Sequence, residues 1–167
     1  MAVRLQRALR GIAAGAGAAL VVAAPVAASA ASPAARTRVR CQASTAIAVA
    51  PGQTGVLAPV VSGVEYGPLR CGAMLGKGIQ SDSFTVPVSG NTMARYVLYL
   101  RSGTLYGTYE LTPEQTGLDF YATTWTGRMR VSGGTGAFRG FHGTGVMSCH
   151  SGDGIHTVCS DRLSLVP

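Results

Sequence analysis

The sequence has few of the residues, and none of the short motifs, that mark the common hydrolases. It contains three histidines, His142, His150 and His156, and seven acidic residues that are scattered along the chain. It lacks a Gly-x-Ser-x-Gly elbow, an HExxH helix and a paired-carboxylate pattern, so nothing points to the enzyme classes that these motifs define. We expect no cofactor. Whether the protein is an enzyme stays open, although the lack of these motifs favours a protein that is not one.

A sustained helical pattern is also missing after the first thirty residues. No stretch there repeats apolar residues every three or four positions, and 23 glycines would interrupt such a helix. Short alternating runs separated by turn sequences take its place, most clearly over residues 123–131, while residues 94–101 and 104–111 flank a Ser-Gly turn. We therefore predict an all-β fold, a small antiparallel up-and-down β-barrel of about eight strands rather than a Greek-key sandwich.

The first residues have the composition of an export signal. Arg4, Arg7 and Arg10 precede an apolar stretch that is too short to span a membrane comfortably, and Ala28-Ser29-Ala30 then supplies small residues for cleavage. We predict a signal peptide over residues 1–30, cleaved after about Ala30. This makes the protein secreted or extracellular, with no membrane span after cleavage; an uncleaved anchor is the alternative.

The remaining chain is expected to contain one domain. Residues 31–40 are small, basic and aperiodic, which predicts a disordered N-terminal segment, and residues 41–167 form the single β-barrel domain. Removing three leader arginines from a chain of net charge +7 leaves a net charge of +4. Because a nucleic-acid-binding protein needs a clustered basic face, this mild excess predicts no nucleic-acid partner.

Four cysteines follow the leader: Cys41, Cys71, Cys149 and Cys159. An even number in an exported chain indicates two disulfides, with three connectivities open, and their order favours Cys41–Cys71 and Cys149–Cys159. Zinc is the alternative for the second pair, since two histidines lie beside it. Adjacent residues of a strand point to opposite faces, and an oxidising compartment favours the disulfide, so we expect no metal.

Glycine dominates residues 133–145, which lie between two alternating runs. A phosphate-binding loop would need a lysine and a following helix, and here Arg139 and a strand follow instead. We predict a tight strand–turn–strand corner in which Phe138 plugs the end of the barrel. The residues assigned to this barrel corner are Gly133, Gly134, Gly136, Phe138 and Gly140.

The run from Gly133 to Phe138, with Gly140 and Gly143 behind it, resembles a motif shared by allene oxide cyclases and dirigent proteins. The likeness covers roughly residues 94–149, and the chain closely resembles secreted bacterial proteins with an allene oxide cyclase barrel-like domain. The resemblance implies an eight-stranded antiparallel barrel with a hydrophobic cavity. It is also compatible with assembly into a homo-oligomer. No catalytic residue of the plant enzymes matches a position here, so it implies no activity.

The inward faces of the central strands suggest the function. Alternation places six large residues on one face, and we assign these to the cavity lining: Leu105, Tyr109, Leu111, Trp125, Met129 and Val131. The first hypothesis is binding of a small hydrophobic ligand in the barrel; a cyclase or isomerase that shapes such a substrate, and a structural module with a filled interior, are the alternatives. Weak catalytic candidates are Glu110, Tyr106 and His142.

Overall fold

A computed structural model of the chain describes residues 35–49, 60–87, 91–115 and 123–167, all of which belong to one compact unit. The predicted signal peptide lies outside the described residues. The elements of the described part are β1 (Thr37–Val49), β2 (Val60–Cys71), β3 (Lys77–Pro87), β4 (Thr92–Leu100), β5 (Gly103–Gln115), β6 (Thr123–Gly134), the 3₁₀ helix η1 (Gly136–Phe138), β7 (His142–Ser151) and β8 (His156–Val166).

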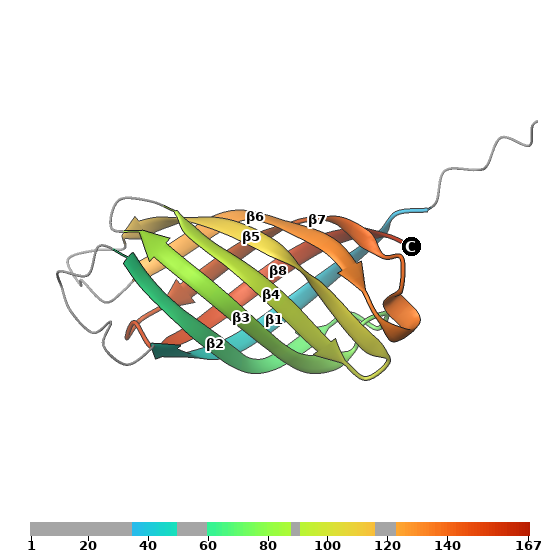
Figure 1. The fold of residues 1–167 in the computed structure, drawn as a ribbon, viewed down its shortest axis with the longest axis horizontal. Helices are drawn as coiled ribbons and strands as arrows, with labels where there is room; N and C mark the ends of the chain where they lie inside the picture. The colour runs from blue at the N-terminus through green and yellow to red at the C-terminus, as the bar shows by residue number, and fades with distance from the viewer. Residues whose placement is uncertain (1–34, 50–59, 88–90, 116–122) are drawn as a thin grey trace, which may run out of the picture. The chain divides into compact units, whose positions relative to one another are not determined.

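The strands form a closed antiparallel barrel in which each strand pairs with the next along the chain (Figure 1). Closure comes from the pairing of β1 with β8, which runs from Thr37 opposite Leu165 to Ala46 opposite His156. The predicted all-β, eight-stranded, up-and-down barrel is therefore confirmed. A closed barrel leaves no unpaired strand edge and gives every strand an inward and an outward face.

The barrel begins earlier than predicted. Residues 37–40, which we expected to be disordered, belong to β1. Val39 is buried, whereas Arg38 and Arg40 on either side of it are exposed. The basic, aperiodic appearance of this segment thus comes from two outward-facing arginines around one core residue. The remaining described residues ahead of β1 are Ala35 and Arg36.

Glycines punctuate residues 64–79 and suggest irregular structure, but this stretch is regular strand apart from one turn. It contains most of β2, the turn at residues 72–76 and the start of β3. The glycines that suggested irregularity permit close packing between strands: a Cβ at Gly67 would collide with the backbone carbonyl oxygen of Ser44 on β1. Glycine here marks a close backbone approach and not a break.

Both favoured disulfides are present, and each joins residues that lie directly opposite on paired strands. Cys41 of β1 bonds Cys71 of β2, with a Cα–Cα distance of 3.9 Å. Cys149 of β7 bonds Cys159 of β8, with a Cα–Cα distance of 4.0 Å. The second bridge occupies both thiolates that the alternative zinc site would have required.

The glycine-rich corner joins β6 to β7 through η1. Gly136 and Gly140 have φ values of 59° and 89°, in the left-handed region that favours glycine. Phe138 is buried and its ring meets Phe141 edge-on at a centroid distance of 5.8 Å. The Ala137 amide donates to the Ser102 carbonyl at 2.9 Å, tying this corner to the β4–β5 turn. The residues chosen from sequence therefore build a compact turn at one end of the barrel.

Candidate functional site

A cavity of about 120 Å³ lies inside the barrel at the end opposite η1, which we call the mouth. Its walls come from the residues nearest this end on all eight strands, and most of them are apolar or aromatic. The lining residues are Ile47, Glu65, Phe84, Val86, Thr92, Tyr109, Leu111, Trp125, Cys149 and Thr157. Concave sites of this kind, with a few polar groups among apolar walls, are typical of small-molecule binding.

Two hydroxyl groups face this cavity from opposite sides of the barrel. Thr92 of β4 and Thr157 of β8 both line it, and both side chains are buried. Neither hydroxyl has a hydrogen-bond partner within the described residues. Because buried polar groups are ordinarily hydrogen-bonded, these two are available to the polar group of a ligand.

Three carboxyl groups lie inside the barrel near the middle of their strands: Glu65, Asp82 and Asp161. We call these three residues the acidic layer. Glu65 of β2 and Asp82 of β3 are direct register partners. Burial and, to a lesser extent, the contact with Glu65 raise the pKa of Asp82 to about 9, although a hydrogen bond from Gln80 Nε2 at 2.8 Å lowers it. Asp82 is therefore protonated at neutral pH and faces a second carboxyl group.

Asp161 completes the acidic layer from β8, on the strand that closes the barrel. It is 1% exposed, and neither carboxyl oxygen has a hydrogen-bond partner within the described residues. Burial raises the pKa of Asp161 to about 7. An isolated buried carboxylate is costly, so this group retains a proton to higher pH than an exposed aspartate.

Two tyrosines connect the acidic layer to the cavity. Tyr96 and Tyr109 are stacked with ring centroids 6.3 Å apart, and the Tyr96 hydroxyl donates to the Arg130 carbonyl at 3.3 Å. Burial, with the nearby carboxyl groups, raises the pKa of both phenols, so both stay neutral. Tyr109 also contacts Asp82 and lines the cavity. A molecule in the cavity thus meets Glu65 and Tyr109, with the protonated Asp82 behind them.

The predicted cavity lining divides into two groups. Tyr109, Leu111 and Trp125 border the cavity, as assigned from sequence. The other three residues lie in the packed part of the core and do not border it: Leu105, Met129 and Val131. Alternation identified the inward face correctly but carried no information about where along the barrel the packing leaves space.

The weak catalytic candidates are not brought together. Glu110 is exposed on the outer face and accepts a hydrogen bond from Asn91 Nδ2 at 2.8 Å. Tyr106 is 43% exposed on the same face, and His142 is exposed at the start of β7 beside the Gly140 carbonyl. These positions are outside the barrel because their strand neighbours, including Leu105 and Tyr109, take the inward direction.

The acidic layer was missed from sequence. Its residues interrupt the polar–apolar alternation by which an inward face is recognised. A signal was nevertheless present, because Asp82 is two residues before Phe84 and Asp161 is two residues after Cys159. Residues two apart in a strand share a face, so the inward direction of Phe84 and of the disulfide would have placed both aspartates inside.

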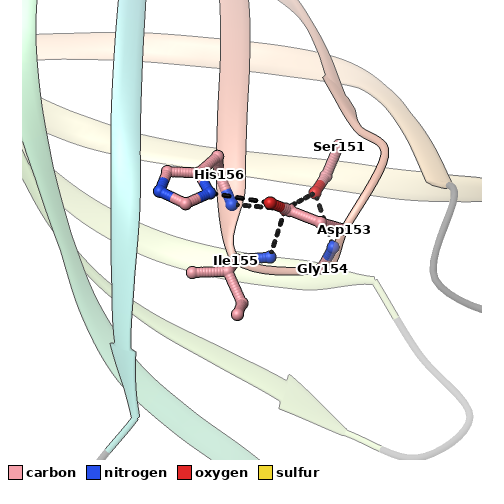
Figure 2. A network of polar contacts seen from close by, with 5 residues as sticks. All are labelled: Ser151, Asp153, Gly154, Ile155 and His156. Carbon is pink, nitrogen blue, oxygen red and sulfur yellow. Dashed lines mark hydrogen bonds and ion pairs between the residues drawn. The ribbon is translucent and has the colours of Figure 1, made fainter.

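A polar network closes the β7–β8 hairpin at the mouth (Figure 2). Asp153 Oδ1 accepts from the amides of Ile155 at 2.8 Å and His156 at 2.7 Å, and Asp153 Oδ2 lies 2.7 Å from His156 Nδ1. The His156 ring, with these amides, holds the pKa of Asp153 well below its usual range. Ser151 Oγ accepts from the Gly154 amide at 2.9 Å. Asp153 and His156 are exposed, whereas Ser151 is buried, and the network shapes the turn beside the cavity.

Within the described ranges, no group of three or more histidine, cysteine, aspartate or glutamate side chains is arranged to hold a metal ion. In the same part of the chain, no helix is long and apolar enough to cross a membrane.

The fold defines a class: the chain is an eight-stranded antiparallel β-barrel with a cavity at one end. The chain is similar to the solved structure of the pterocarpan synthase dirigent protein GePTS1, with a TM-score of 0.52 and 15% identity over 81% of this chain and 87% of that one. It is also similar to pyocyanin demethylase, with a TM-score of 0.43 and 13% identity over 79% of this chain and 100% of that one. No protein-family model and no curated protein matches the chain. At 15% identity, the likeness to the dirigent protein shows the fold alone.

Proposed function

We propose that the protein binds a small, mainly hydrophobic molecule in the mouth cavity, with a polar group of that molecule directed toward Glu65, Thr92 and Thr157. The observation that carries this proposal is an apolar cavity of about 120 Å³ into which unpartnered buried hydroxyls project. A cavity of roughly 150 Å³ admits a benzene-sized ring, so this one suits a single ring or a branched alkyl end. A cyclic alcohol or ketone satisfies both the walls and the hydroxyls.

Trp125 makes the proposal directly measurable. It is the only tryptophan in the chain, and it lines the cavity. Titration with cyclohexanol should change the tryptophan emission in a saturable manner, and more strongly than the hydrocarbon cyclohexane, which offers no hydrogen bond to the threonines. A purely linear change with both compounds would reject a defined site.

A matched pair of variants locates the binding. Thr157 points into the cavity, whereas its neighbour Val158 is 46% exposed on the outside. Thr157→Phe should fill the cavity and abolish the cyclohexanol response, and Val158→Phe should leave it intact. Thermal unfolding of both variants checks that each is folded. Equal responses in the two variants would contradict binding at the mouth.

A second candidate function is proton transfer to or from the bound molecule, as in a cyclase or isomerase. Glu65 on the cavity wall, opposite the protonated Asp82, favours it, because a paired base and acid is the arrangement that such chemistry uses. Cyclohexanone in D₂O tests this: the enzyme would remove an α-proton and return deuterium, which NMR detects. Glu65→Gln should abolish that exchange while retaining ligand binding; exchange no faster than in buffer would exclude this function.

We also propose that the protein works outside the reducing cytosol. Two disulfides support this location, since such bonds persist mainly in oxidising compartments. Recovery of the processed chain from culture medium, beginning near Ala31 by N-terminal sequencing, would agree with export. Retention of the intact chain in cells would contradict it.

A further inference from the structure

Five arginines border the outer face of the barrel around β7, and they come from β6, β8 and β1. These four strands are neighbours in the barrel (Figure 1). The arginines border a groove whose floor contains Val146, which is 50% exposed, and the small or hydroxyl-bearing residues Thr144, Gly145 and Ser164. We call this the arginine groove; the arginines are Arg38, Arg40, Arg128, Arg130 and Arg162. All five are exposed.

The strand register explains the groove. Arg40 of β1 is opposite Arg162 of β8, and across β7 from them Val146 is opposite Arg128 of β6. In the next row, Ser164 is opposite Arg38 and Thr144 is opposite Arg130. Two walls of arginine therefore stand on either side of β7, separated by two strand spacings, or about 10 Å.

These cations are not neutralised by neighbouring acids. Within the described residues, none of the five arginines forms an ion pair. Glu110 is opposite Arg128 in the register, and its carboxylate accepts from Asn91 instead. Three of the seven acidic residues of the chain are inside the barrel, so the exterior is more basic than the net charge suggests. Like charges held together in this way favour an anionic partner.

The volume and length of the groove suit an extended chain. The part between the arginine walls has a volume of about 660 Å³, and a continuation of about 490 Å³ passes Arg36 and His142 while sharing Thr144 and Ser164. From Val146 to His142 along β7, the floor spans about 13 Å at the usual strand rise. A linear polyanion fits this space, whereas a nucleic-acid duplex is too wide to enter between the walls.

We propose that the arginine groove binds a linear acidic polysaccharide, a glycan chain carrying carboxylate groups. Arginine forks bind carboxylates in a bidentate manner, and the Thr144 and Ser164 hydroxyls match sugar hydroxyls. No phenylalanine, tyrosine or tryptophan lines either part of the groove, so it lacks the row of aromatic rings on which single-stranded nucleic acid stacks. Barrel closure also leaves no strand edge onto which an acidic peptide could add.

Binding of polygalacturonate to the whole protein tests the proposal, with neutral dextran as the comparison polymer. We expect saturable binding to polygalacturonate that weakens steeply as salt rises from about 50 to 200 mM, and no binding to dextran. Absence of polygalacturonate binding at about 50 mM salt would overturn the proposal. Equal or tighter binding to single-stranded DNA, or to phosphatidylserine vesicles, would also overturn it.

A charge-matched control separates the groove from net charge. R40Q/R162Q should lower the affinity for polygalacturonate about tenfold or more and reduce the salt dependence. R70Q/K77Q removes the same charge from β2 and β3, where the two residues are exposed register partners outside the groove, and should lower it less than about twofold. Similar losses in both variants would reject a localised site; circular dichroism confirms that both are folded. The result of this experiment does not depend on whether the mouth cavity binds a ligand.

Discussion

At the η1 end of the barrel, leucines and Phe138 fill the interior, whereas at the mouth aromatic and hydroxyl side chains surround a cavity of about 120 Å³. Leu98, Leu105 and Leu165 are each 0% exposed. Between the two ends lies the acidic layer, in which Asp82 and Asp161 keep their protons unusually well. One end of the same strand set therefore resembles an ordinary protein core, and the other carries groups that an ordinary core excludes.

The difference separates stability from function within one barrel. Packed apolar side chains contribute most of the free energy of folding, while buried polar groups reduce it unless they are paired. Unpartnered hydroxyls at the mouth and the buried carboxyl groups of the acidic layer consequently lower the stability, and the leucine-filled end offsets this loss. Shortening an apolar side chain should therefore lower the free energy of unfolding more at the η1 end than at the mouth.

The largest effect is expected from shortening a leucine in the filled end. Leu105→Ala should lower the free energy of unfolding by about 3–5 kcal/mol, because it opens a void among fully packed neighbours. Leu111→Ala at the mouth should cost about 1–3 kcal/mol, since Leu111 already borders a cavity and has fewer neighbours to lose. Urea denaturation measures both, and equal costs would remove the proposed contrast between the ends.

The two disulfides allow the ends to be compared again. Cys41–Cys71 lies beside the turn at the η1 end and closes a sequence separation of 30, whereas Cys149 borders the cavity and its bridge closes a separation of 10. Replacing both cysteines by alanine should cost about 3–4 kcal/mol for the first pair and about 2–3 kcal/mol for the second, because the longer loop gains more entropy when opened. A larger loss from the shorter loop would indicate that strain or packing outweighs entropy.

The acidic layer predicts an unusual pH dependence. The folded-state pKa of Asp161, about 7, exceeds its ordinary value of 3.8, so the folded protein binds more protons than the unfolded chain and loses stability as pH rises through this window. Asp161→Asn should remove about 2–4 kcal/mol of the decline between pH 4 and pH 8. A residual decline, from Asp82, should continue toward pH 9. An unchanged pH profile in the variant would show that Asp161 ionises normally.

The smallest effect is expected in the exposed hairpin at the mouth. Asp153→Ala removes the acceptor for the Ile155 and His156 amides and should speed hydrogen exchange at those two positions. Global unfolding should hardly change, since the network is exposed and local. A change in exchange throughout β8 would instead show that the turn supports the barrel.

Much of the fold could be predicted because its central strands obey a simple alternation. Residues 123–131 have apolar side chains inward and polar ones outward, and the predicted strand lies within β6. The leader offered no structural test, as it lies outside the described residues. β2 and β3 are harder to recognise from the sequence, because Glu65, Gln80 and Asp82 point inward and interrupt the alternation of polar and apolar residues.

The candidate site was harder to predict for the same reason. Whether a carboxyl group is buried depends on the residues that surround it in the fold. These residues lie on strands that are distant in the sequence, so composition cannot reveal the burial. The arginine groove on the outer surface was missed from the sequence as well. Arg38, Arg128 and Arg162 are scattered in sequence, and only the strand register brings them to one face. A mild net charge therefore concealed both an acidic interior and a basic exterior.

The β1–β8 pairing has a kinetic consequence. Every other strand pair joins neighbours along the chain, whereas this one joins the two ends of the barrel. Non-local pairings of this kind form late, because the entropy of closing a long loop is lost before the contacts are gained. Asp161 lies on this seam, opposite Cys41, so it leaves water only when the barrel shuts. Refolding should accordingly be faster in mild acid than in mild alkali.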